Sequence, residues 1–164
     1  MYFFQINIQI KQIFKKNIIN FYFIKQKINK KGDNKNALKY FDLVSSAVPS
    51  DPGIHCKLGM LYSSENDEAQ AFHHFSESHK LLPTNLNAIA WLGIFYVKNC
   101  NYHKAAQFFE IAAKTNSKDL KWKLMIASCY RRMDQLQKAL DLYKEVNEKD
   151  PENMEALKFI GKLF

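Results

Sequence analysis

The fold is decided by residues 92–109, which read LGIFYVKNCNYHKAAQFF. A Leu-Gly pair opens this stretch and is followed by a tyrosine, and an alanine further on is followed by a phenylalanine. Both patterns return along the chain at steps of 34 residues. Several landmarks that share one step indicate an internal repeat, which must be recognised before any element is assigned.

The repeated positions carry residues of one size or type. Small residues are followed four positions later by aromatic ones: Ala37, Ala71, Ala105 and Ala139, then Phe41, Phe75, Phe109 and Tyr143. An apolar-small pair precedes an aromatic residue: Leu58, Gly59 and Tyr62; Leu92, Gly93 and Tyr96; Ile126, Ala127 and Tyr130; Ile160, Gly161 and Phe164. Prolines close the pattern: Pro49, Pro83 and Pro151, with Ser117 at the remaining step. This period and these landmarks are typical of the tetratricopeptide repeat (TPR), and the resemblance covers about residues 18–164.

A TPR is a pair of antiparallel helices, and each landmark has a physical reason. A mid-helix glycine costs ~1 kcal/mol relative to alanine, which close helix packing can justify. Proline ends the second helix because it cannot stand in a helix interior. The sequence therefore predicts an all-α fold, a TPR α-solenoid of antiparallel helix hairpins wound as a right-handed superhelix.

The predicted helices pair into hairpins along the chain. They cover 16–30 and 34–47, 53–64 and 68–81, 86–98 and 102–114, 120–132 and 136–148, and a last helix from Asn153 to Phe164. Residues 32–164 are expected to form an array of about four repeats with the last one incomplete, and residues 1–31 to form a separate leader.

The leader has its own composition. Residues 1–31 consist mainly of Ile, Phe, Lys, Asn and Gln, with seven lysines and no acidic residue. Of the 24 basic residues in the chain, 17 therefore remain in 32–164, against 16 acidic ones. A nearly neutral repeat region lacks the basic face that binds phosphates, so no nucleic-acid partner is expected.

The leader is interpreted as a disordered extension or a gene-model artefact, because these residue types have AT-rich codons. The alternative is a basic membrane-surface helix, since Phe21, Phe23 and Ile24 alternate with lysines. Lysines also interrupt the apolar runs, so neither a secretory signal nor a membrane span is indicated. The three cysteines are odd in number and widely spaced, which favours a reducing compartment over a disulfide framework.

No catalytic, cofactor or metal signature is present, so the chain is predicted not to be an enzyme, with no cofactor, metal or small-molecule substrate. Cys100 and His103 share one helix turn, but no further ligand stands at metal-binding spacing. The remaining candidates are assigned structural positions. Cys129 is predicted to be a small buried residue at a helix crossing, and three histidines to lie on solvated faces: His73, His74 and His79.

Protein binding by the concave face is the favoured function. The first helix of each hairpin lines that groove, and the matching positions carry small or apolar residues: Cys56, Met60, Ala90, Ile94, Leu124 and Ser128. The basic residues that hold a terminal carboxylate in some TPR proteins are not at these positions. An apolar partner segment is therefore expected, although packing within a longer superhelix would also cover such a groove.

The helix predicted over 120–132 also carries a basic group, Lys121, Lys123, Arg131 and Arg132. Such a group is usually a solvated face. If it binds a partner, an acidic protein surface is favoured over nucleic acid.

The stretch LKWKLMIASCYRRMDQLQKALDLYKEVNEKDPEN, residues 120–153, resembles the polaris-type TPR subunit of intraflagellar transport complex B. The stretch VPSDPGIHCKLGMLYSSENDEAQAFHHFSESHKLLPTNLNAIAWLGIFYV, residues 48–97, is similar to the same family. Family members are far longer, so this chain is expected to be a truncated relative. Its family-like residues that are candidates for partner contact are Trp122, Arg131 and Arg132.

The resemblance implies a scaffold that takes part in cilium assembly. Its partners would be other complex B subunits, and its location the cilium, the basal body and the cytoplasm, on the microtubule cytoskeleton. Two alternatives stay open: a stand-alone TPR adaptor that binds an apolar peptide, and a protein tethered to a membrane surface by residues 1–31.

Overall fold

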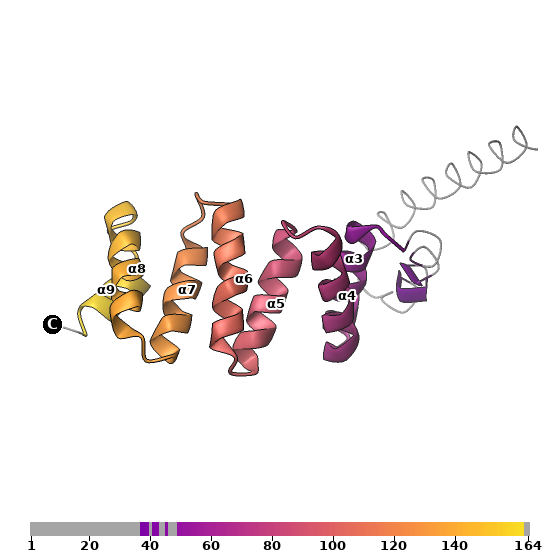
Figure 1. Ribbon diagram of the computed structural model, residues 1–164, viewed down its shortest axis with the longest axis horizontal. Coiled ribbons are helices and arrows are strands. Elements are labelled where there is room, and N and C mark those ends of the chain that lie inside the picture. Colours follow the sequence, from indigo (N-terminus) through magenta and orange to yellow (C-terminus); the bar gives the residue numbers. More distant parts are fainter. Residues whose placement is uncertain (1–36, 40, 43–44, 46–48, 163–164) are drawn as a thin grey trace, which may run out of the picture. The chain divides into compact units, whose positions relative to one another are not determined.

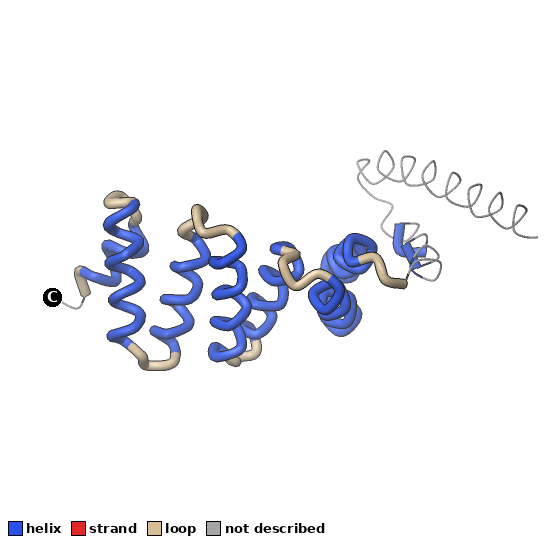
Figure 2. The backbone as a smooth tube through the Cα atoms, turned by 45° about the horizontal axis from the view of Figure 1, so that its top comes forward, coloured by secondary structure: helices blue, strands red, loops and turns tan. Residues whose placement is uncertain are grey.

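The computed structural model describes residues 37–39, 41–42, 45 and 49–162. The predicted leader, the predicted helix over 16–30 and Phe164 lie outside the described residues. The described part is helical and contains no strand (Figures 1 and 2). Its helices are α3 (Pro52–Ser64), α4 (Glu68–Leu81), α5 (Leu86–Lys98), α6 (Tyr102–Thr115), α7 (Lys121–Arg132), α8 (Leu136–Lys149) and α9 (Met154–Ile160).

The predicted helix boundaries agree with the structure. Each of α3 to α8 begins and ends within one residue of its predicted range. The last helix, α9, begins one residue after the predicted Asn153 but ends at Ile160, short of the predicted Phe164. None of the described helices is long and apolar enough to span a bilayer.

The chain divides into two units, Met1–Ala71 and Phe72–Phe164. In the first unit, Phe41, Ile54 and Leu58 form a buried cluster, and Tyr62 packs against it. At the start of α3, Asp51 Oδ1 accepts hydrogen bonds from the backbone N–H groups of Gly53 (2.7 Å) and Ile54 (3.1 Å). Asp51 is thus an N-cap, which satisfies two N–H groups that have no partner within the helix.

The second unit has a repetitive architecture. Helices α5 to α9 follow one another as antiparallel neighbours joined by short loops (Figures 1 and 2). Two buried clusters run through it. The first is centred on α5, α6 and α7: Ile89, Ala105, Ala106, Phe109, Ala112, Trp122, Ile126 and Cys129. The second joins α7, α8 and α9: Ala127, Ala139, Tyr143, Val146, Ala156 and Phe159.

Gly93 marks the closest approach of α5 and α6. A Cβ atom at this position would lie 2.3 Å from Phe109 Cε1. Phe109 is itself 1% exposed, so its ring has no free space into which to move. The contact explains why α5 carries a glycine in mid-helix, at a position where helix propensity alone would favour alanine.

The turns within the hairpins also repeat. Asn66, Cys100 and Asp134 adopt positive φ angles of 63°, 56° and 59°, and they stand 34 residues apart. In each turn the N–H of the following residue bonds back across the helix end, as Asn101 N does to Tyr96 O (2.8 Å) and Gln135 N to Tyr130 O (2.9 Å). This is the Schellman motif, whose left-handed position favours Gly or Asn. Cys100 is therefore the unusual member of the set.

We expect Cys100→Gly to stabilise the protein by about 1 kcal/mol, because a left-handed conformation costs a residue with a Cβ about that much. The greater freedom of glycine in the unfolded chain offsets part of the gain. Urea unfolding at equilibrium measures the effect, with Cys100→Ala as the control that keeps the Cβ. A lower urea midpoint for Cys100→Gly than for Cys100→Ala would contradict the assignment.

Candidate functional site

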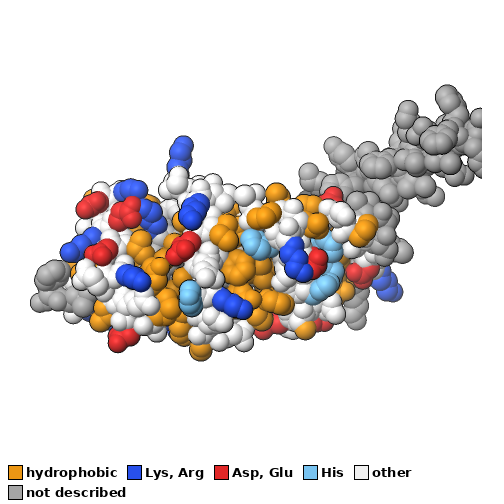
Figure 3. Space-filling view, viewed as in Figure 1, with side chains coloured by type: hydrophobic (Ala, Val, Ile, Leu, Met, Phe, Trp, Pro, Cys, Tyr) orange, Lys and Arg blue, Asp and Glu red, His pale blue; other side chains and the backbone are white. Residues whose placement is uncertain are grey.

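In the second unit, the predicted groove positions are accessible on α5 and α7. Ile94 is 43% exposed, while Ala90, Leu124 and Ser128 are half-buried. Residues four apart on a helix share a face, so each helix presents one pair of these side chains. Figure 3 shows hydrophobic side chains gathered over α5 and α6 on the face in view.

The first unit differs at the same repeat positions. Met60 is 37% exposed, but Cys56 is only 5% exposed. The prediction of Cys56 as a partner-contact residue is therefore wrong, because its thiol is enclosed by its own chain. Met60 remains a candidate.

The repeat continues into α9, where sequence analysis did not follow it. Lys158 and Lys162 stand 34 residues after Leu124 and Ser128, and both are exposed. The groove positions thus change from small and apolar on α5 and α7 to basic on α9 and the turn after it. Counting one further step of the repeat would have found both lysines.

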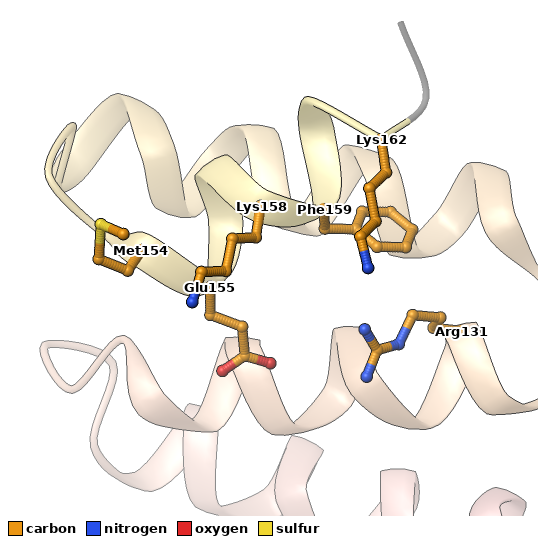
Figure 4. Close-up of a pocket in the computed structure, with 6 residues that line it drawn as sticks. All are labelled: Arg131, Met154, Glu155, Lys158, Phe159 and Lys162. Atoms are coloured by element: carbon orange, nitrogen blue, oxygen red, sulfur yellow. The ribbon is translucent and has the colours of Figure 1, made fainter.

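A pocket of about 480 Å³ opens between α7 and α9 at these lysines. Its lining consists of Arg131 from α7 and, from α9 and the turn after it, Met154, Glu155, Lys158, Phe159 and Lys162. Figure 4 shows the Arg131 guanidinium and the Lys162 ammonium directed toward the same open space. The guanidinium carbon of Arg131 lies 5.8 Å from the centroid of the Phe159 ring, which gives it a cation–π contact.

Glu155, the one acidic residue of this pocket, is held by α8. Its Oε1 accepts a hydrogen bond from the Tyr143 hydroxyl at 3.2 Å. Burial and the negative charge of Glu155 raise the pKa of Tyr143 to about 12, against the opposing effect of Arg131. The phenol therefore stays protonated and keeps donating this bond across the physiological pH range.

The predicted basic group does not form one surface. Lys123 makes an ion pair with Glu145, and this hydrogen bond lowers the pKa of the Glu145 carboxyl. Lys121 pairs with Asp119 at 3.5 Å. Arg132 is exposed and donates a hydrogen bond to the Tyr102 hydroxyl at 3.3 Å. Of the four cations, Arg131 alone lines the pocket at α9.

Trp122 is a core residue. It is 3% exposed and lies 6.4 Å, centroid to centroid, from the Phe109 ring. Its prediction as a partner contact is therefore wrong, because the side chain is covered by α5 and α6. The family-like residues that remain accessible are Arg131 and Arg132.

The histidine prediction holds for His73 alone, which is exposed. His74 is only 9% exposed. The half-buried His79 lies 5.2 Å from the Phe108 ring and has a buried Nδ1 with no hydrogen-bond partner in the described structure. Within the described ranges, no three His, Cys, Asp or Glu side chains are grouped to hold a metal ion.

We expect His79→Leu to make the protein less sensitive to acid. Burial lowers the pKa of His79 below its usual value of 6.5, so the unfolded chain takes up a proton that the folded chain refuses. The stability that this provides is complete above the unfolded pKa and is lost as the pH falls toward the folded pKa. Urea unfolding of both proteins at neutral pH and at about pH 5 measures it. A stability difference between variant and parent that does not change with pH would contradict the assignment.

Cys129 is 1% exposed, which confirms its prediction as a small buried residue. Burial raises the pKa of its thiol to about 11, although the charge of Arg132 acts in the opposite direction. A thiol with so high a pKa is almost entirely protonated at neutral pH and is a poor nucleophile.

Sequence analysis also missed an aromatic group around α5. The half-buried Trp91 stacks on Phe75 at 4.7 Å and on Phe95 at 5.4 Å, and Tyr96 stacks on Phe108 at 5.5 Å. Phe95 and Trp91 are not repeat landmarks, so the 34-residue pattern gave no signal for them. Their packing joins α4, α5 and α6 and fixes the face of α5 that carries Ile94.

The comparisons with known proteins relate the sequence to one curated protein. No family model matches the chain. A segment of 55 residues is 49% identical to the human "Intraflagellar transport protein 88 homolog". The segment is 34% of this chain and 7% of that relative, so the chain spans a small part of its length.

Similar solved structures show the fold. MamA 41-end from Desulfovibrio magneticus RS-1 matches 81% of this chain and 75% of that one, with a TM-score of 0.68 and 22% identity. The N-terminal domain of stress-induced protein-1 from C. elegans matches 67% of this chain and 92% of its own, with a TM-score of 0.58 and 15% identity. The Arabidopsis OM64 TPR domain matches 68% and 93%, with a TM-score of 0.57 and 16% identity. The predicted fold class, an all-α TPR solenoid, is confirmed, and the chain is a TPR protein related to human intraflagellar transport protein 88 homolog.

Proposed function

We propose that this chain is a non-enzymatic scaffold that binds other subunits of intraflagellar transport complex B and takes part in cilium assembly. The observation that carries the proposal is the segment of 55 residues that is 49% identical to the human intraflagellar transport protein. Residues 32–164 form the array of about four repeats in this proposal, and residues 1–31 stand apart from it. The protein would be found in the cilium, at the basal body and in the cytoplasm.

The accessible groove of the second unit supports a role in protein binding. Ile94 on α5 is a large apolar side chain that is 43% exposed, and the half-buried Leu124 on α7 occupies the corresponding groove face. Exposed apolar side chains that gather on one surface mark interaction sites. The catalytic candidates offer little, because the Cys129 thiol is buried and protonated.

A tagged chain at its native level tests the proposal. We expect it to enter cilia and to co-purify with complex B subunits. Ile94→Glu should weaken that recovery, and Leu81→Glu is the matched control because Leu81 is 41% exposed outside the predicted groove. Absence from cilia together with no recovery of complex B subunits would exclude the proposed role.

The second candidate is a stand-alone TPR adaptor that binds an apolar peptide segment. The exposed Ile94 favours it, because a groove of this kind can accept the apolar face of a helix. Recovery of a partner outside complex B that depends on Ile94, from cells in which the protein stays out of cilia, would favour this candidate over the first.

A further inference from the structure

We infer that the pocket between α7 and α9 binds an acidic segment of a partner protein, in which two carboxylate side chains flank an apolar one. The inference rests on the proposed scaffold role and names the chemistry of one partner site. Three cations surround the pocket, Arg131, Lys158 and Lys162, together with the single carboxylate of Glu155. Their net charge is +2, which two carboxylates would balance.

The three cations are available for a ligand. None of them forms an ion pair with a carboxylate in the part of the chain that the structure describes. This separates them from Lys121 and Lys123, which the chain already pairs with Asp119 and Glu145. Basic side chains that remain unpaired on a concave surface attract acidic partners and set their orientation.

Glu155 limits where the partner charges can lie. Its carboxylate is held by the Tyr143 hydroxyl, so it is fixed at one side of the pocket (Figure 4). A partner carboxylate would be repelled there and drawn toward Arg131 and Lys162 instead. The fixed acid therefore gives the pocket a direction as well as a net charge.

The apolar part of the ligand has a surface of its own. Met154 is 62% exposed at the edge of the pocket, and the Phe159 ring forms part of its wall. A flexible thioether beside an aromatic ring accommodates leucine or methionine side chains of different shapes. Leu124 and Ser128, one repeat earlier, continue the groove away from the cations with small or apolar side chains.

The chemistry of the lining favours acidic side chains over a free chain terminus. The lining contains no Asn or Gln amide that could orient a single carboxylate group. Two of its three cations are lysines, which act as flexible point charges and not as a planar fork. Such a site responds to the number of negative charges more than to the geometry of one carboxylate.

Fluorescence anisotropy on the full chain tests the inference. The probe is a short fluorescein-labelled peptide that is amidated at its C-terminus and has glutamates on both sides of a leucine. We expect it to bind about tenfold more tightly than the same peptide with glutamines, and the difference to shrink as salt is added. The double variant Lys158→Glu, Lys162→Glu should remove the preference for the glutamate peptide.

The matched control is the double variant Lys114→Glu, Lys118→Glu, which makes the same change in net charge at exposed positions outside the pocket. It should keep the preference, and equal melting temperatures of the two variants would show that both are folded. Equal binding of the glutamate and glutamine peptides, or equal losses in both variants, would overturn the inference. Tighter binding of a glutamine peptide with a free C-terminal carboxylate would overturn it in favour of a chain terminus. These readouts need no cilia, so their failure is distinguishable from failure of the complex B role.

Discussion

Gly93→Ala is expected to lower the melting temperature, although alanine is the better helix former. In an exposed helix the change would gain about 1 kcal/mol. Here the new Cβ would stand 2.3 Å from Cε1, 2.7 Å from Cζ and 2.9 Å from Cδ1 of Phe109. The Phe109 ring is 1% exposed, so α5 and α6 must separate or the ring must leave its rotamer. Overpacking of this kind costs about 1–3 kcal/mol, and Gly93→Leu should cost more than Gly93→Ala.

A double-mutant cycle with Phe109→Leu identifies the cause. Phe109→Leu alone should destabilise the protein, because it removes ring contacts from the core around Ile89 and Trp122. In that background Gly93→Ala should cost less than in the parent, with a coupling energy of about 0.5–3 kcal/mol. The measurement is urea unfolding of all four proteins. A rise in stability for Gly93→Ala in the parent would show that α5 and α6 do not meet at this glycine.

The same spacing explains why the fold could be predicted from the sequence. A repeat of two helices fixes each element several times over, so a weak signal in one repeat is supported by the others. Helix ends were predicted well because local chemistry sets them: Asn66 and Asp134 take the left-handed position in the turns, and Pro83 follows the end of α4. Cys100 fills the same position without the usual residue type, and the repeat alone locates it.

The binding surface was harder to predict, because exposure depends on how neighbouring hairpins pack. Cys56 and Ala90 occupy equivalent positions, yet Cys56 is buried and Ala90 is half-buried. The burial of His79 and the stacking of Trp91 likewise result from contacts between helices. Lys158 and Lys162 are a different case, because the repeat register contained them and predicts the basic end of the groove once it is extended into α9.

Trp122→Ala is expected to destabilise the protein by about 3–5 kcal/mol, the usual cost of removing a large aromatic side chain from a core. Trp122 is 3% exposed and packs between Phe109 of α6 and Ile126 of its own helix. Its loss would leave a cavity at the point where α5, α6 and α7 meet. Thermal or urea unfolding measures the cost.

Trp122→Phe separates the contribution of the ring from that of the indole N–H. The Nε1 atom is buried with no hydrogen-bond partner within the described structure, so losing it removes an unsatisfied donor that costs about 1–3 kcal/mol. A phenylalanine keeps much of the stacking on Phe109, and its smaller volume offsets part of that gain. We therefore expect Trp122→Phe to be far closer to the parent in stability than Trp122→Ala.

Arg132→Ala is the matched surface change on the same helix. Arg132 is exposed, and surface substitutions usually change stability by less than about 0.5 kcal/mol. A partner-contact role for Trp122 makes the opposite prediction, that Trp122→Ala weakens binding at an unchanged melting temperature. Since the α6–α7 packing depends on the indole ring, Trp122→Ala should reduce partner binding only to the extent that it unfolds the second unit, and binding should recover when the temperature is lowered.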